Sequence, residues 1–244
     1  MSVSNSTFTN NTALTGGAIF TSQNDPSVGD VSVSNSTFTN NKAGTLGGAI
    51  FAGSEVSSVS NSTFTNNRAV ASGGAIFAGA NVSVTYSTFT GNTATEAGSA
   101  IRLSGVGTAF GSVFVKPPGT VDLCFGDLVT GGTFTSLGYN YANETANSCN
   151  LTATGDSSLD ANDAKLGGLG DNGGPTPTQL PQSGSPLINA IPNAACQTAP
   201  LATGITTDQR HLARPEQTGG TCDIGAVEVQ LPPAAVTVTP KFTG

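Results

Sequence analysis

Hydrophobic residues in the first hundred positions alternate with polar ones in short stretches, and Gly and Asn separate the stretches. Val31 and Val33 are followed by Phe38 and then by Ile50, with mostly Ser, Thr, Asn and Gly between them. Alternation with a period of two is typical of short β-strands with one buried face. The 3.6-residue spacing and the strong helix formers of a helical repeat are missing. We therefore expect three short strands per unit, joined by turns.

The same unit recurs along the chain. The phrase SVSNSTFTNN occupies residues 2–11, 32–41 and 58–67, and SVTYSTFTGN occupies 83–92. The four phenylalanines of these copies are 30, 26 and 25 residues apart, and each precedes a Gly pair or its relic by 8 or 9 residues. We interpret TSQNDPSVGD, in the longest interval, as an inserted loop because Asp-Pro and Gly-Asp form turns. A period near 25 residues predicts a solenoid with one coil per repeat.

Stacked coils place each residue above its copy in the next coil, about 4.8 Å away. Asn amides in register can hydrogen-bond along the stack, and Asn also tolerates the left-handed backbone of sharp corners. Phe and Ile are expected to stack inside, and the Gly pairs permit tight corners. The predicted ladders are Asn5, Asn35 and Asn61; Asn11, Asn41, Asn67 and Asn92; Phe8, Phe38, Phe64 and Phe89; and Ile19, Ile50, Ile76 and Ile101.

Two motifs in residues 1–103 resemble a known bacterial family. FTNN matches an FxxN motif and GGAI completes it, as in the chlamydial polymorphic outer-membrane proteins and related adhesin-like repeats. Those proteins are right-handed parallel β-helices on the outer cell surface. The resemblance thus implies an all-β, right-handed, single-stranded parallel β-helix (β-solenoid) with roughly 25 residues per coil.

The repeat fades after Leu103, but short strand-like stretches continue, so we expect further β-helix coils over residues 104–229. Within 136–229 the stretches SLGYNYANETANSCNL, GDNGGPTPTQLPQSGSPLINA, DQRHLARP and CDIGAVE resemble the end of bacterial surface proteins described as choice-of-anchor Q domain proteins. In that group the β-helix precedes a cell-surface anchor. His211 stands where that group usually has Gly, and Asn189 where it usually has Asp.

Five charged residues lie in and near those closing motifs: Asp208, Arg210, Arg214, Asp223 and Glu228. We interpret them as a structural ion-pair network that closes the last coils, because an Arg fork pairs with carboxylates in a specific geometry. The alternative is an acid/base site, but nothing in the sequence resembles a nucleophile with its base. His211, the single His, is interpreted as a surface or capping residue.

Four cysteines, Cys124, Cys149, Cys196 and Cys222, occur without a CxxC pair. With one His available, a zinc site is not expected. Three pairings are possible, and sequence proximity favours Cys124–Cys149 and Cys196–Cys222. Disulfides indicate an oxidising, extracellular setting, whereas four buried free thiols are the alternative.

Charge and hydropathy exclude several classes of function. Only 9% of residues are charged, the net charge is −7, and no Lys/Arg cluster suits a phosphate backbone, so we expect no nucleic-acid binding. No apolar run approaches the roughly 20 residues of a membrane span, and the polar first residues do not form a signal peptide. No cofactor is expected. The loop carrying Asp156, Asp160, Asp163 and Asp171 could offer oxygen ligands to Ca²⁺, but its spacing misses the EF-hand pattern.

These features predict a non-catalytic extracellular structural or adhesive protein that binds either itself or a cell-surface or glycan receptor. Residue 1 lies within a repeat, and the tail 230–244 contains the alternating stretch AVTVT, so strand addition could build a head-to-tail homopolymer. One alternative is a polysaccharide-active β-helix enzyme, although paired carboxylates are scarce. Another is a passive glycan- or ice-binding face built from Thr7, Thr37, Thr63 and Thr88.

Overall fold

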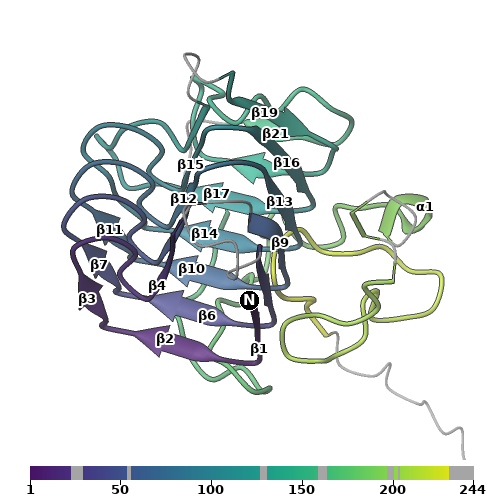
Figure 1. Cartoon of the computed structure of the whole chain (residues 1–244). Helices are drawn as coiled ribbons and strands as arrows, with labels where there is room; N and C mark the ends of the chain where they lie inside the picture. The colour runs from purple at the N-terminus through teal and green to yellow at the C-terminus, as the bar shows by residue number, and fades with distance from the viewer. Residues whose placement is uncertain are drawn as a thin grey trace, which may run out of the picture.

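A computed structural model describes residues 1–22, 30–53, 56–126, 131–158, 164–196, 201–202 and 204–230. Its short strands wind into a stack of parallel coils, and successive turns lie roughly 26 residues apart (Figure 1). The all-β parallel β-solenoid predicted from the repeat is thereby confirmed. The one described helix, α1, spans Asn193–Cys196. None of the described helices is long and apolar enough to cross a membrane.

Each of the first three coils contains four strands, and later coils contain fewer. The strands of these three coils are β1 (Ser2–Ser4), β2 (Thr7–Thr9), β3 (Thr12–Ala13) and β4 (Ile19–Thr21); β5 (Val31–Ser34), β6 (Thr37–Thr39), β7 (Lys42–Ala43) and β8 (Ile50–Ala52); and β9 (Val56–Ser60), β10 (Thr63–Thr65), β11 (Arg68–Ala69) and β12 (Ile76–Ala78). The later strands are β13 (Val82–Thr85), β14 (Thr88–Thr90), β15 (Ile101–Leu103), β16 (Val106–Phe110), β17 (Val113–Val115), β18 (Cys124–Gly126), β19 (Thr133–Ser136), β20 (Tyr141–Ala142) and β21 (Ser157–Ser158).

These strands form four parallel sheets that run along the solenoid. Sheet A joins β1, β5, β9, β13, β16 and β19; sheet B joins β2, β6, β10, β14, β17, β20 and β21; sheet C joins β3, β7 and β11; and sheet D joins β4, β8, β12, β15 and β18. Sheets A, B and D contain the three strands per coil that the hydrophobic pattern predicted. Sheet C was not predicted, because two-residue strands are too short to show a period.

The interior is built from columns of identical apolar side chains. Phe8, Phe38, Phe64 and Phe89 stack with successive ring centroids 4.8 Å apart and nearly parallel planes. Ile19, Ile50, Ile76 and Ile101 lie in register inside sheet D, where all four are buried. Phe8 is half-buried because its coil has a neighbour on one side. Both apolar ladders predicted from the repeat therefore exist in the structure.

A second column lies at the corner between sheets B and C. The Nδ2 groups of Asn11, Asn41 and Asn67 each donate to the Oδ1 of the next asparagine, which ends at Asn92, over 2.9–3.0 Å. These are not the left-handed residues of that corner. The preceding Asn10, Asn40 and Asn66 adopt φ of 58°, 56° and 56°, which leaves the following Asn free to point inward. The four side chains thus form the predicted amide ladder.

The C-terminal half divides into two parts. Coils continue through β21, and Leu151 and the Cys124–Cys149 disulfide belong to the core at that end. The described residues of 164–230, named here the C-terminal segment, contain helix α1 and isolated bridges but no strand. The segment lies along one side of the solenoid (Figure 1). The expectation of coils over 104–229 therefore fails for the described residues from 164 onward, because this Pro- and Gly-rich chain lacks the alternating pattern of a strand.

Candidate functional site

The C-terminal segment covers the outer face of sheet B. Gln209 lies at the centre of this contact: its Oε1 accepts a hydrogen bond from Thr63 Oγ1 (2.7 Å), and its Nε2 donates to Thr37 Oγ1 (2.8 Å) and Thr176 Oγ1 (2.9 Å). The Ala226 N–H donates to Thr88 Oγ1 over 3.0 Å. Since the threonines of coils two to four are buried and hydrogen-bonded within the chain, they cannot form the open glycan- or ice-binding face predicted as an alternative.

The corner between sheets A and B contacts the same segment. Asn5, Asn35 and Asn61 lie in register with φ of 48°, 46° and 43°, as expected for a sharp corner. Their described side-chain hydrogen bonds do not run along the column. His211 Nε2 and Asn5 Oδ1 lie 2.8 Å apart, and Asn61 Nδ2 donates to Thr207 O over 2.8 Å. This column therefore attaches the segment to the coils, and His211 has a capping role on an exposed surface.

The five predicted ion-pair residues come together inside the C-terminal segment. Arg210 Nε and Nη2 both donate to Asp208 Oδ2, over 2.9 and 2.8 Å. The same oxygen accepts a bond from the Glu228 N–H (3.0 Å). Asp208 is fully buried and Arg210 nearly so, and their contacts with the Glu228 backbone fix this turn to the chain around Glu228. The network lies beside the middle coils, whereas the sequence predicted it over the last ones.

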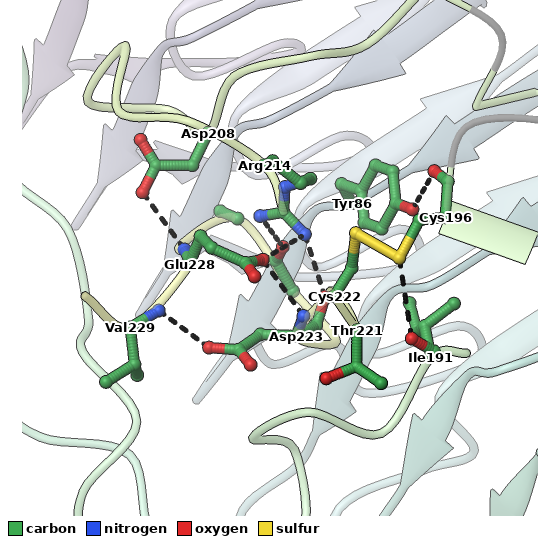
Figure 2. Close-up of polar contacts among 12 residues, drawn as sticks. Tyr86, Ile191, Cys196, Asp208, Arg214, Thr221, Cys222, Asp223, Glu228 and Val229 are labelled. Carbon is green, nitrogen blue, oxygen red and sulfur yellow. Dashed lines mark hydrogen bonds and ion pairs between the residues drawn. A yellow bond between two sulfur atoms is a disulfide. The ribbon is translucent and has the colours of Figure 1, made fainter. Parts of the chain in front are cut away.

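Arg214 forms the second half of the network (Figure 2). Its guanidinium donates to the backbone oxygens of Asp223 (2.7 Å) and Gly225 (2.8 Å) and lies 3.6 Å from Glu228 Oε2. It also lies 4.1 Å from the centroid of the Tyr86 ring, a cation–π contact with the solenoid. Arg214, which connects the segment to the coils, is thus both charged and almost completely buried.

Burial changes the protonation of this network. Desolvation raises the pKa of Glu228 to about 7, and the charge of Arg214 opposes that shift. Desolvation likewise raises the pKa of Asp223, against the hydrogen bonds from Asn189 N and Val229 N. Burial also raises the pKa of the Tyr86 hydroxyl to about 12. The free energy with which the C-terminal segment packs on the solenoid should therefore depend on pH.

The geometry favours a structural role for these carboxylates. Glu228 Oε2 accepts the Asp223 N–H over 2.9 Å, and the Asp223 carboxylate accepts the N–H groups of Asn189 and Val229, both over 2.6 Å. A cavity of about 290 Å³ lies next to Arg214, but neither acid is among the residues that line it. Backbone donors occupy the oxygens that an acid/base mechanism would need for its substrate.

Both disulfides favoured by sequence proximity are present and confirm those pairings. Cys124–Cys149 fixes the strand β18 to the chain that closes the far end of the coils, with Cα atoms 4.8 Å apart. Cys196–Cys222 joins helix α1 to the network region, with Cα atoms 5.7 Å apart. Tyr86 donates its hydroxyl to Cys196 O over 2.5 Å, so the second disulfide is also connected to the solenoid.

The predicted calcium loop is only partly described. Asp160 and Asp163 lie outside the described residues. Asp156 accepts the N–H groups of Asn140 (2.9 Å) and Ala153 (2.7 Å), and Asp171 accepts that of Gly173 (3.0 Å), so both carboxylates cap turns. Among the described residues, no three His, Cys, Asp or Glu side chains lie close enough to hold a metal ion.

The outward side chains of sheets C and D, named here the C–D face, lie away from the contacts of the C-terminal segment with sheet B. Phe20, Phe51 and Phe77 stack along sheet D with centroids 5.3 and 5.0 Å apart, and Arg102 continues the column 4.9 Å from the Phe77 centroid. Phe20 is 56% exposed. This column was not predicted from the sequence, although each Phe follows an inward Ile and must point outward in a strand. Sheet C adds Lys42 and Arg68, and the residues just past its strands β3 and β11 add Leu14 and Val70; all four are exposed.

Part of the chain matches the model of a known repeat family. The Chlamydia polymorphic membrane protein (Chlamydia_PMP) repeat matches residues 5–22, 35–53 and 61–79. Each match begins at the corner between sheets A and B and extends to the strand of sheet D or just past it. No curated protein and no solved structure matches the chain. The resemblance of residues 136–229 to choice-of-anchor Q domain proteins stays a prediction. The first three coils are thus similar to polymorphic membrane protein repeats, and together with the solenoid this similarity supports a β-helix like that of those repeats.

Proposed function

We propose that this chain is a non-catalytic, extracellular adhesive scaffold that contacts its partner through the C–D face. The observation that carries the proposal is the difference between the two sides of the solenoid. The C-terminal segment buries sheet B with hydrogen bonds from Gln209 and Ala226. The C–D face keeps Leu14 75%, Phe20 56% and Val70 46% exposed. Exposed apolar side chains gathered on one face favour a site of protein or surface contact.

Two further features support an extracellular scaffold. Two disulfides fix the last coils and the C-terminal segment, as is usual outside the reducing cytosol. The repeating coils form an extended, regular surface, which suits contact with an extended partner better than catalysis in a closed cleft. The polymorphic membrane protein repeats are compatible with display at a bacterial surface.

An adhesion assay with paired variants tests the proposal. Beads coated with the whole chain should adhere to cultured animal cells, and Phe20→Ser should reduce adhesion severalfold. Val106→Ser is the matched control, because Val106 is 49% exposed but belongs to strand β16 of sheet A. Equal loss in both variants, or no adhesion by the parent chain, contradicts the proposal. So does depolymerisation of a polysaccharide by the purified chain.

A head-to-tail filament is a second candidate. Such a filament would join chains by the same parallel pairing that joins successive coils, since an unpaired strand offers backbone groups to another chain. The AVTVT stretch that was predicted to supply the added strand lies in 231–244, outside the described residues. Electron microscopy of the purified chain at high concentration separates the two candidates, since a filament subunit should form long fibres and a monomeric scaffold only short rods.

A further inference from the structure

Sheet C carries two positive charges in register on its outward face. Thr12, Lys42, Arg68 and Thr93 occupy the same position in successive coils, as the parallel pairings show. Lys42 and Arg68 are therefore neighbours on adjacent strands, about 4.8 Å apart in backbone spacing. Like charges directly opposite each other destabilise a sheet. The threonines at both ends of the column show that the fold does not require a cation there.

The two cations have no partner within the described chain. Neither side chain forms a hydrogen bond or an ion pair with another described residue, and both are exposed. Glu96, an exposed acid of the following coil, forms no ion pair with Arg68, although its backbone N–H bonds to Ala71 O nearby. By contrast, Lys116 pairs with Glu144 over 3.0 Å. The charge pair on sheet C thus remains available to an external anion.

A column of amides lies beside the charges. Asn10, Asn40 and Asn66 form the left-handed corner that precedes sheet C, and all three are exposed. Their described hydrogen bonds use the backbone N–H groups, so the side-chain amides face solvent. The second coil therefore presents the Asn40 amide beside Lys42, and the third coil presents the Asn66 amide beside Arg68. The two pairs are separated by the strand spacing of the solenoid.

We propose that Lys42 and Arg68, with Asn40 and Asn66 beside them, bind an anionic polysaccharide that bears carboxylate or sulfate groups. Arg binds such groups with two parallel N–H donors, Lys adds a point charge, and the amides suit sugar hydroxyls. Two cations are too few for tight binding to a phosphate backbone. The neighbouring Phe51 and Phe77 rings stack on each other, so they offer no free faces to nucleic-acid bases. The inference rests on the proposed adhesive function and names its ligand.

Dextran sulfate and neutral dextran are matched probes for this site. Binding of dextran sulfate to the whole chain, measured by biolayer interferometry, should weaken as salt rises, and dextran should not bind. The variant with both Lys42→Thr and Arg68→Thr copies the residues of the flanking coils and should fold. Two exposed ion pairs predict about 2- to 30-fold weaker binding. Lys165→Asn is the charge-matched control for Arg68→Thr alone, because each removes one positive charge; Lys165 is exposed on the C-terminal segment and its φ of 44° suits Asn.

The outcomes separate the inference from the proposed function. Equal weakening by Arg68→Thr and by Lys165→Asn overturns the inference, since binding would then follow net charge alone. So does equal binding of dextran. Comparing polygalacturonate with dextran sulfate distinguishes a carboxylated from a sulfated ligand, and failure of both to bind overturns the site. If the parent chain adheres to cells while neither polymer binds, the adhesive function stands and this ligand assignment falls.

Discussion

Replacing Asn67 with alanine removes four buried hydrogen bonds from the centre of the amide ladder. Asn67 Oδ1 accepts bonds from Asn41 N (3.0 Å) and Asn41 Nδ2 (2.9 Å). Its Nδ2 donates to Phe38 O and Asn92 Oδ1, both over 3.0 Å. Alanine leaves the Asn41 N–H and the Phe38 carbonyl without these partners inside the protein.

The magnitude follows from the burial of these groups. A typical hydrogen bond contributes roughly 1 kcal/mol, and a buried unsatisfied group costs about 1–3 kcal/mol. We therefore expect Asn67→Ala to lower the free energy of unfolding by about 3–5 kcal/mol, and Tm by about 6–20 °C for a chain of this size. Asn11→Ala is the matched control. Asn11 is exposed at the end of the same ladder and donates one side-chain bond, to Asn41 Oδ1, so about 0.5–1 kcal/mol is expected.

Urea denaturation monitored by far-UV circular dichroism, with disulfides intact, measures both variants. Hydrogen exchange then shows whether the loss is concentrated in the coils that flank Asn67, because neighbouring coils in a solenoid stabilise each other. If Asn67→Ala and Asn11→Ala destabilise the protein by the same amount, the amide ladder is not a buried, mutually satisfied column. The stacking argument would then be wrong at this corner.

Three further perturbations test other parts of the structure. Gly48→Ala should lower stability by about 1–3 kcal/mol in thermal denaturation because its Cβ would lie 1.9 Å from a carbonyl oxygen of the next coil, whereas Gly44→Ala, with 3.3 Å to a flexible side chain, should have little effect. Removing Cys124 and Cys149 together should destabilise the last coils by about 3.5 kcal/mol, given the sequence separation of 25 residues, and proteolysis should then begin there. Burial raises the pKa of Glu228 from 4.5 to about 7, so the folded state holds this proton more tightly than the unfolded state; its stabilisation is greatest below pH 4.5 and is lost as pH rises through 7. The urea concentration at the midpoint of unfolding should therefore decrease as the pH is raised from 5 to 8.5. Glu228→Gln should make this decrease smaller.

Repeated residues made the coils predictable. Phe64, for example, packs between its copies Phe38 and Phe89 in the neighbouring coils, so its environment follows from the repeat itself. Glycine pairs and left-handed asparagines mark corners because few other residues adopt that backbone. The outward Phe51 follows from the same alternation, although its exposure depends on what the rest of the chain covers.

The C-terminal segment was less predictable. Asp208, Arg210, Arg214, Asp223 and Glu228 were recognised as one ion-pair network, but their place beside the middle coils was not. A salt bridge within the segment is suggested by composition and local motifs. The contact of Arg214 with Tyr86, which lies more than a hundred residues earlier in the chain, has no local signal in the sequence.

The sequence by itself determined the solenoid, its period, the stacked columns and the favoured disulfide pairing, because each depends on residues that repeat or lie close along the chain. Only the tertiary structure decided which columns face solvent. Thr63 points outward from sheet B and Lys42 points outward from sheet C. Gln209 buries Thr63, whereas no described residue pairs with the charge of Lys42. The physical reason is that outward positions obtain their environment from a distant, non-repeating segment, whereas inward positions obtain theirs from their own copies.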